Sequence, residues 1–367
     1  MPRPLLLAMT LATLALPLCV PLARADHLKV PSAQFPTIQS AADAATNGDV
    51  IVIAKGVYDE AVTMTGKTGV TIRAKKGAII DNEHTDIGLE MNGCGIIVVR
   101  GLTVRDGTGS GIFLGGCADI VITRCNVLNT GGDAITLANC GNVRIVRNRI
   151  EQGFVGVNAD AQGVVIRDNR ISNVVTTAVQ IIGNGFAIEG NRIAGVASLH
   201  GLTIGNGDPA SAASVMITRN SIRNIADGLA GDGIHLNGVA QCTVLANRIS
   251  KTSGHGVNIV SGAALTIQSN RITKPGVDGM HGSAQKVQYL SNVVRNAAGS
   301  GIVLDSTSDQ SLLFGNSVKG CAEYGLDVDS DFNEILENTA TGSGLFDLRN
   351  QGMLNTLVDN VFGTVAT

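Results

Sequence analysis

The triplet Asn247-Arg248-Ile249 is one copy of a pattern that recurs along most of this chain: Asn, any residue, then an aliphatic residue. A repeat with a short and nearly constant period indicates a solenoid, in which each period forms one coil that contacts only its neighbours. Copies begin at Asn126, Asn148, Asn169, Asn191, Asn220, Asn247, Asn270, Asn292, Asn316, Asn338 and Asn360, at intervals of 21 to 29 residues and most often of 22.

Each period also carries short strand patterns. Gly followed by aliphatic, polar and aliphatic residues occurs in Gly233-Ile234-His235-Leu236, and another alternating run precedes the Asn, as in Leu265-Thr266-Ile267. About three strands per period are expected, separated by Gly, Asn, Asp and Ser turns. Strands stacked at about 22 residues per coil predict an all-β parallel β-helix, with coils about 4.8 Å apart. The repeated Asn would form a column, an Asn ladder, in which each amide bonds to the next.

With this repeat and this Asn column, the chain resembles the right-handed parallel β-helix proteins of the pectin-lyase-like superfamily. The resemblance covers nearly the whole chain after its first residues, and it implies a right-handed all-β solenoid. Because one fold hosts many chemistries, the resemblance does not by itself decide the function.

The chain divides into three segments. Residues 1–25 are predicted to be a signal peptide, with Arg3, an apolar run from Leu5 to Val20, and Ala23-Arg24-Ala25 as the cleavage site. Residues 26–48 form a lead-in and a helix, since apolar residues at 35–45 have helical spacing, and this helix would cap the first coil. Residues 49–367 form one β-helix domain. No stretch predicts a membrane span, so a periplasmic or extracellular protein is expected.

Composition limits the partners. Loss of Arg3 and Arg24 from the 27 Lys and Arg leaves 25 basic against 30 acidic residues, a net charge of −5, which argues against nucleic-acid binding. The chain has no Trp and three Tyr, so a stacking platform for neutral sugars is not expected. A bound glycan should therefore be acidic and held by polar groups.

Three cysteines share one position of the repeat. Cys94, Cys117 and Cys140 are each 23 residues apart, which places them in one column on successive coils. Neighbours in this column could form one disulfide in an oxidising compartment. The interpretation that we favour is a stack of small buried side chains.

Polar residues gather beside the Gly of successive periods. Directly before the Gly stand His200, Asp232, His255 and Asp278, and after the first aliphatic residue stand His235, Asn258 and His281. The second set should point outward, because it lies between inward aliphatic residues. The turn position of the first set leaves its direction open. If it also points outward, Asp232 and Asp278 would flank His255 and orient its imidazole for acid or base catalysis.

Part of this region is similar to the mannuronan C5-epimerases. Ser253-Gly254-His255-Gly256-Val257-Asn258-Ile259-Val260 resembles their His-Gly-x-Asn-aliphatic-Val stretch, and Asp232-x-x-His235 resembles their Asp-Pro-His, although the Pro is absent and the two coils adjoin. The resemblance implies that His255, His235 and Asp232 are catalytic and that Lys251 neutralises a substrate carboxylate. His200, Asn258, Asp278 and His281 would bind the substrate.

Two other interpretations stay open for the same residues. Asp and His before Gly are also favourable turn residues with solvated side chains. His, Asp and Asn can also ligate a divalent metal, although no dedicated metal motif is present and no metal ligand is assigned.

The first coil carries a further resemblance. Its Ala-rich helix, Gly48-Asp49, aliphatic strand and Gly56-Val57-Tyr58 are similar to secreted carbohydrate-binding and sugar-hydrolase β-helices and to nitrous oxide reductase accessory proteins. Our lead hypothesis is a secreted β-helix that binds or modifies an acidic extracellular polysaccharide, as an epimerase or lyase would. The alternative is a non-catalytic periplasmic or surface scaffold that binds a protein partner or a metal. No cofactor is assigned.

Overall fold

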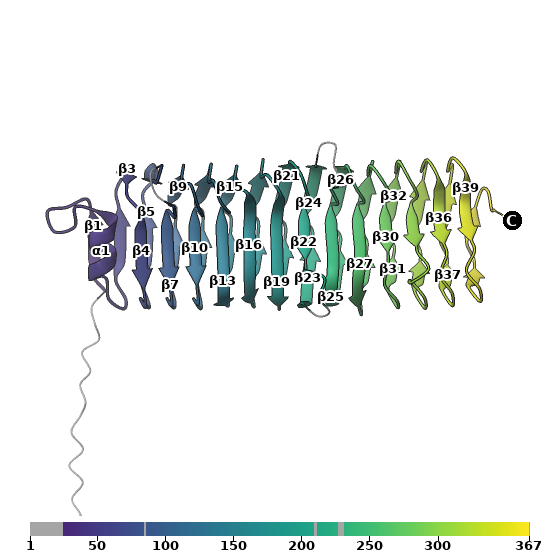
Figure 1. Ribbon diagram of the computed structural model, residues 1–367, viewed down its shortest axis with the longest axis horizontal. Helices are drawn as coiled ribbons and strands as arrows, with labels where there is room; N and C mark the ends of the chain where they lie inside the picture. Colours follow the sequence, from purple (N-terminus) through teal and green to yellow (C-terminus); the bar gives the residue numbers. More distant parts are fainter. Residues whose placement is uncertain (1–24, 84–85, 209–210, 227–230, 367) are drawn as a thin grey trace, which may run out of the picture.

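The computed structural model describes residues 25–366, except 84–85, 209–210 and 227–230. The predicted signal peptide lies outside the described residues, apart from Ala25. The described chain is an elongated stack of coils with the N-terminal helix at one end and the last coil at the other (Figure 1). None of its helices is long and apolar enough to cross a membrane.

The strands of successive coils pair in parallel and form three columns within the described ranges. Two columns belong to a 27-stranded sheet, because long strands such as β25 continue from one column into the other, and the third column is a 14-stranded sheet. The first column consists of β4 (Val62–Thr65), β7 (Leu89–Asn92), β10 (Ile112–Gly115), β13 (Ile135–Gly141), β16 (Val155–Gln162), β19 (Thr177–Asn184), β22 (Leu202–Ile204), β25 (Ile234–Leu245), β27 (Val257–Ala263), β30 (Met280–Gly282), β33 (Ile302–Leu304), β36 (Tyr324–Val328) and β39 (Phe346–Asn350).

The second column consists of β1 (His27–Val30), β2 (Val50–Ile53), β5 (Thr71–Ala74), β8 (Val98–Arg100), β11 (Val121–Thr123), β14 (Arg144–Val146), β17 (Val165–Arg167), β20 (Ala187–Glu189), β23 (Ala212–Thr218), the later part of β25, β28 (Thr266–Gln268), β31 (Gln288–Leu290), β34 (Leu312–Phe314), β37 (Glu334–Leu336) and β40 (Thr356–Val358). The third consists of β3 (Gly56–Asp59), β6 (Ala78–Asp81), β9 (Thr103–Arg105), β12 (Asn126–Leu128), β15 (Arg149–Glu151), β18 (Arg170–Ser172), β21 (Arg192–Val196), β24 (Ser221–Ile225), β26 (Arg248–Thr252), β29 (Arg271–Thr273), β32 (Val293–Arg295), β35 (Ser317–Lys319), β38 (Thr339–Thr341) and β41 (Val361–Phe362).

The alternation of each strand places aliphatic residues in a continuous core and polar residues outside. In β25, Ile234 and Leu236 are fully buried while His235 between them is partly exposed. The glycine before β25 is needed for close packing, since a Cβ on Gly233 would lie 2.5 Å from the carbonyl oxygen of Gly256 in the next coil. The predicted all-β parallel solenoid is thereby confirmed.

The Asn ladder runs through the turns between the second and third columns. Asn247 donates through its side-chain Nδ2 to the Ile217 carbonyl (2.8 Å) and to Asn270 Oδ1 (3.0 Å), and its Oδ1 accepts the backbone N–H of Asn220 (2.9 Å). The residue before it, Ala246, has left-handed backbone (φ 55°), which makes the bend tight. The described ladder residues are Asn148, Asn169, Asn191, Asn220, Asn247, Asn270, Asn292, Asn316, Asn338 and Asn360.

One predicted rung is wrong. Cys125, not Asn126, occupies the ladder position in its coil, where its backbone N–H donates to Asn148 Oδ1 (2.9 Å). Asn126 lies one residue further along, pairs in register with Arg149 on β12 and β15, and bonds to the Thr103 hydroxyl on the outer side. A shift of one residue along a strand moves a side chain to the opposite face, and the triplet pattern alone does not show this shift.

The helix α1 (Ile38–Ala44) is the predicted cap. Thr37 closes its N-terminus with a capping box, and Glu60 accepts the backbone N–H groups of Ile38 and Gln39, both at 2.9 Å. The lead-in is more ordered than an extended tail, because β1 pairs in parallel with β2 and so extends the sheet.

The cysteine column is a stack of buried thiols. Cys94, Cys117 and Cys140 are 1 to 4% exposed, and they are free, as are the other three described cysteines. Their sulfurs donate to backbone carbonyls, for example Cys117 to Met91 (3.2 Å). The apolar interpretation, and not the disulfide, describes this column.

Candidate functional site

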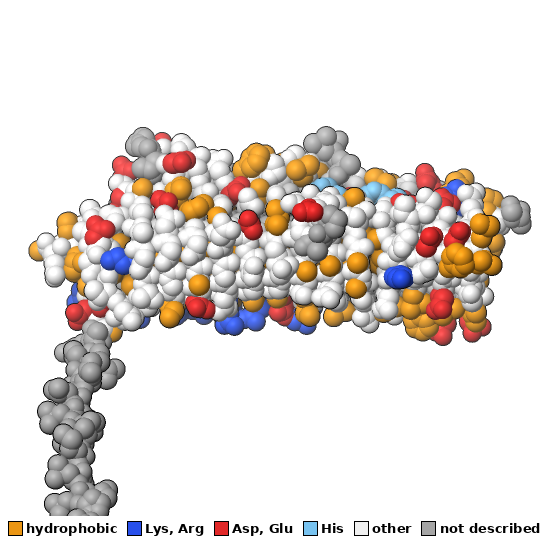
Figure 2. Space-filling view, turned by 60° about the horizontal axis from the view of Figure 1, so that its bottom comes forward, with side chains coloured by type: hydrophobic (Ala, Val, Ile, Leu, Met, Phe, Trp, Pro, Cys, Tyr) orange, Lys and Arg blue, Asp and Glu red, His pale blue; other side chains and the backbone are white. Residues whose placement is uncertain are grey.

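Four histidines lie in adjacent coils along the first strand column, at the turn before β22, β25, β27 and β30 or on the strand itself. Figure 2 shows histidine side chains on the surface along the upper side of the solenoid. They form two clusters with the carboxylates between them, and within each cluster the ligand-type atoms lie within 4.8 Å of one another. We call His200, Asp232 and His235 the upstream cluster, and His255, Asp278 and His281 the downstream cluster.

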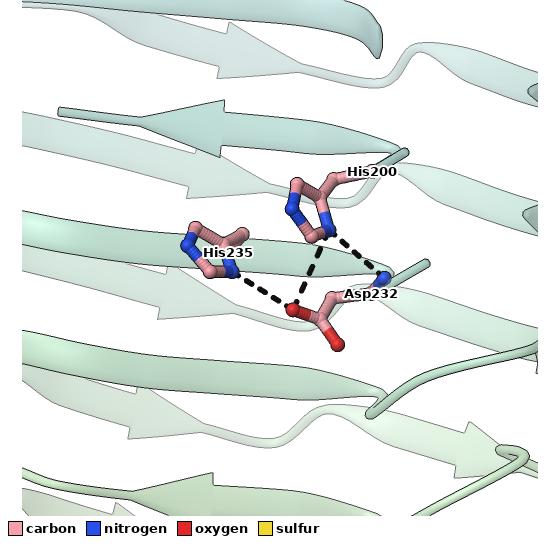
Figure 3. Close-up of side chains that lie close together, drawn as sticks. All are labelled: His200, Asp232 and His235. Atoms are coloured by element: carbon pink, nitrogen blue, oxygen red, sulfur yellow. Dashed lines mark hydrogen bonds and ion pairs between the residues drawn. The ribbon is translucent and has the colours of Figure 1, made fainter. Parts of the chain in front are cut away.

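In the upstream cluster a buried carboxylate orients a partly exposed imidazole. Asp232, 2% exposed, lies at the turn before β25, and its Oδ2 is 2.8 Å from Nδ1 of His235 on the same coil (Figure 3). Its Oδ2 also accepts the Asn258 side-chain N–H (3.0 Å), and its Oδ1 accepts the backbone N–H of His255 (2.8 Å). Because Oδ2 contacts Nδ1, Asp232 does not engage the other ring nitrogen of His235.

These bonds also fix the charge of the carboxylate. Burial alone would raise the pKa of Asp232, but the hydrogen bonds from His235, Asn258 and the His255 backbone hold it below its usual value. Asp232 is therefore ionised at neutral pH, and its Oδ2 orients the His235 ring through Nδ1.

His200 completes the upstream cluster in a neutral form. Its ring stacks on that of His235, with centroids 4.2 Å apart and planes inclined by 14°, and its Nδ1 accepts the backbone N–H of Asp232 at 3.0 Å (Figure 3). Burial, together with the neighbouring His235, lowers the pKa of His200 to about 4. The stacked rings thus differ in their hydrogen bonds, since Nδ1 of His200 is an acceptor while Nδ1 of His235 faces a carboxylate.

The downstream cluster contains the same residue types, but the distances between its carboxylate and its imidazoles are longer. Asp278 Oδ2 lies 3.3 Å from Nδ1 of His255 and 3.3 Å from Nδ1 of His281. Its Oδ1 accepts the backbone N–H of Ser300 in the next coil (2.7 Å), which fixes the carboxylate. Hydrogen bonding to Asp278 raises the pKa of His281. Burial alone would raise the pKa of Asp278, but the hydrogen bonds from His255, His281 and the Ser300 backbone hold it well below its usual range.

The structure divides the predicted site residues in a way that the sequence did not predict. His255 contacts both predicted carboxylates, but its imidazole faces Asp278 and only its backbone N–H bonds to Asp232. Asn258 donates a hydrogen bond to Asp232 of the upstream cluster. Lys251 lines a groove with Gly195, Val196, Ala197, Asn224 and Ala226, a set that includes no residue of either cluster.

The two aspartates are also more than solvated turn residues. Asp232 and Asp278 are buried, with 2% and 8% exposure. Their turn role is nevertheless real, because Asp133 occupies the same position without a histidine cluster and accepts the backbone N–H of Val155 and the side-chain N–H of Asn158. The carboxylate at this turn is thus structural, and the two clusters add histidines to it.

The anchor at Ser300 was not predicted from the sequence, whereas the Asp-x-x-His spacing was noted there. Asp232 and His235, and likewise Asp278 and His281, are three residues apart across a turn and a strand start, and they meet on the outside of one coil. The repeated Asp-Gly-aliphatic-His phrase was the available signal. The anchor at Ser300 is a backbone contact, for which no side-chain signal exists.

The fold and the repeat agree with known proteins. The family described as "Right handed beta helix region" matches residues 58–158 and 232–364, more than half of the chain. This chain belongs to that family. No curated protein sequence matches the chain.

Solved structures share the fold at low sequence identity. The mannuronan C-5 epimerase AlgE6 A-module of Azotobacter vinelandii is 16% identical, with 90% of this chain and 93% of that chain covered and a TM-score of 0.59. The catalytic domain of a GH87 alpha-1,3-glucanase in complex with tetrasaccharides is 13% identical, with coverage of 92% and 69% and a TM-score of 0.62. The periplasmic alginate epimerase AlgG is 12% identical, with coverage of 85% and 77% and a TM-score of 0.53. At these identities the likeness shows the right-handed β-helix alone.

Proposed function

We propose that this protein is secreted and modifies an acidic extracellular polysaccharide, in a uronate epimerase-like or lyase-like reaction at the two histidine clusters. The observation that carries the proposal is the pair of Asp232 and His235, 2.8 Å apart, in which a buried carboxylate holds an imidazole at the surface. Structural likeness to a mannuronan C-5 epimerase and to a glucanase supports a polysaccharide as the substrate.

The pair suits the first step of either reaction. A uronate carries a proton on C5, next to its carboxylate, and His235 would remove that proton with the ring nitrogen that Asp232 does not bind. The electron pair of the C–H bond then moves towards the carboxylate. In an epimerase C5 regains a proton on its opposite face, and in a lyase the pair forms the C4–C5 double bond while the oxygen on C4 leaves and takes up a proton.

The resemblance to the epimerases implied that His255 is catalytic together with His235. Because the imidazole of His255 faces Asp278 and His281, we instead assign the downstream cluster, with Asn258, to binding of the substrate carboxylate. The proton for C5 or O4 would come from solvent. His200, stacked on His235, stays a proposed binding residue that keeps the upstream rings in place.

The tyrosines support an acidic substrate. Tyr289 is fully buried, Tyr58 bonds through its hydroxyl to the carbonyls of Val30 and Ala54, and Tyr324 lies under the guanidinium of Arg349 at 4.9 Å. No described Tyr therefore forms a free platform beside the clusters on which a neutral sugar ring could stack.

The test is incubation of the tag-free protein with alginate and with polygalacturonate, with and without added Zn²⁺ or Ca²⁺. Absorbance of unsaturated ends would report a lyase, and the proton NMR spectrum of the polymer would report epimerised uronates. We expect turnover that falls by about 10²- to 10⁴-fold in His235→Gln, the range for loss of a general base.

Asp133→Asn is the matched control. Asp133 has the same turn position and equivalent bonds as Asp232, so Asp133→Asn should leave turnover unchanged while Asp232→Asn lowers it. Absence of turnover on both polymers, or full activity in folded His235→Gln, would contradict the proposal.

A further inference from the structure

The downstream cluster brings three donor atoms together at distances that hydrogen bonds do not explain well. Both N···O separations between Asp278 and the two imidazoles are 3.3 Å, whereas a hydrogen bond between a charged imidazole and a carboxylate is usually about 2.7–2.9 Å. The other bond to His255 Nδ1, from the backbone N–H of Asp278, is also long at 3.4 Å. The hydrogen bonds at Asp278 Oδ2 and at the Nδ1 atoms of His255 and His281 are therefore weak.

The same separations fit ligands around one metal ion. With Zn–N and Zn–O bonds of about 2.0–2.2 Å, two ligand atoms of a tetrahedral site lie about 3.4 Å apart. Asp278 Oδ2 meets this spacing with both His255 and His281, and the ligand-type atoms of the cluster lie within 4.8 Å of one another.

The upstream cluster differs in the state of its donor atoms. Asp232 Oδ2 already accepts hydrogen bonds at 2.8 and 3.0 Å, and His200 Nδ1 accepts a backbone N–H at 3.0 Å. A metal would have to displace all of these bonds. The two clusters therefore contain the same residue types, but the downstream cluster is better suited to bind a metal. The upstream cluster can serve as its control.

The surroundings of the downstream cluster favour a cation. The negative charges of Asp305 and Asp232 add to that of Asp278 in the surroundings of His281. The positively charged Lys251 lines a separate groove. The backbone N–H of Ser300 holds Asp278 through the oxygen that faces away from the imidazoles, an anchor of the kind that orients metal ligands.

We propose that His255, Asp278 and His281 bind one divalent first-row transition ion, with Zn²⁺ as its representative. Two imidazoles and one carboxylate select such an ion over Ca²⁺ and Mg²⁺, which prefer oxygen ligands. Three protein ligands leave a further coordination position open, as in catalytic rather than structural zinc sites. The site rests on the geometry of the cluster alone, whereas a role in neutralising a uronate carboxylate rests on the proposed function.

The test is titration of the tag-free full protein with Zn²⁺, by calorimetry and by competition with a chromogenic chelator. We expect saturable binding that is lost in His281→Gln and in Asp278→Asn. The amide oxygen of the latter variant can still accept the N–H of Ser300, so the turn should persist. Circular dichroism and thermal unfolding would establish that both variants are folded.

The upstream variants His200→Gln and His235→Gln should keep this binding site, and Ca²⁺ should not compete with Zn²⁺. The inference is overturned if the protein does not bind Zn²⁺ saturably, or if folded His281→Gln binds as well as the unmodified protein while His235→Gln does not. Because the readout is binding, it is independent of turnover: binding without turnover would count against the proposed function only.

Discussion

Asn247 lies in the middle of the Asn ladder and is fully buried. Its side chain donates two hydrogen bonds, to the Ile217 carbonyl and to Asn270 Oδ1, and accepts two, from the backbone N–H and Nδ2 of Asn220. Asn247→Ala removes all four and leaves buried partners of the neighbouring coils without them. At about 1 kcal/mol for each net hydrogen bond, the free energy of unfolding should fall by about 3–5 kcal/mol.

Asn126→Ala is the matched comparison for this prediction. Asn126 follows the same sequence pattern, but it lies outside the ladder and its side chain makes a partly buried bond to the Thr103 hydroxyl, which water can replace. We expect a loss below about 1 kcal/mol. Urea unfolding followed by circular dichroism would measure both variants. Equal losses in the two variants would refute the argument that buried amide pairing, and not the triplet itself, stabilises the coils.

Three further predictions concern His200, the cysteines and two glycines. The pKa of His200 is lowered to about 4, so between pH 6.5 and 4 the unfolded state binds a proton that the folded state does not. Stability should fall as the pH falls through this window, by at most about 3 kcal/mol, and His200→Gln should flatten this part of the pH curve. A thiol reagent should leave the six described cysteines unmodified in the native protein and label all six in urea, and an intact disulfide would contradict this. Gly233→Ala should destabilise, because its Cβ would lie 2.5 Å from the Gly256 carbonyl, whereas Gly141→Ala, with no atom within 4 Å, should be nearly neutral in urea unfolding.

The sequence contained enough to predict how the chain folds. A period near 22 residues, alternating strands and a recurring Asn identify a parallel solenoid, because every coil must repeat the same inward and outward pattern to continue the core. The helical spacing at 35–45 likewise predicted the cap, which the structure places at Ile38–Ala44. These properties are local or periodic, and a single chain records them directly.

The sequence also predicted which stretch would be polar and rich in histidine, and it placed His235, Asn258 and His281 correctly on the outside of one strand column. Alternation fixes the side of a strand residue and says nothing about the direction of a side chain at a turn. His200, Asp232, His255 and Asp278 stand at such turns. Their pairing therefore stayed open, and so did the exposure of the two carboxylates.

Only the tertiary structure decided that the histidines divide between two carboxylates. Asp232 lies at hydrogen-bond distance from His235 and Asn258, while Asp278 lies 3.3 Å from His255 and His281. The cause is the offset between neighbouring coils: a turn side chain meets partners on its own coil and on the next one, and which of these it reaches depends on angles set by the packing of both coils. The residue types and the three-residue spacing from Asp to the following His are the same in the two clusters, and their difference in geometry exists only in the assembled stack.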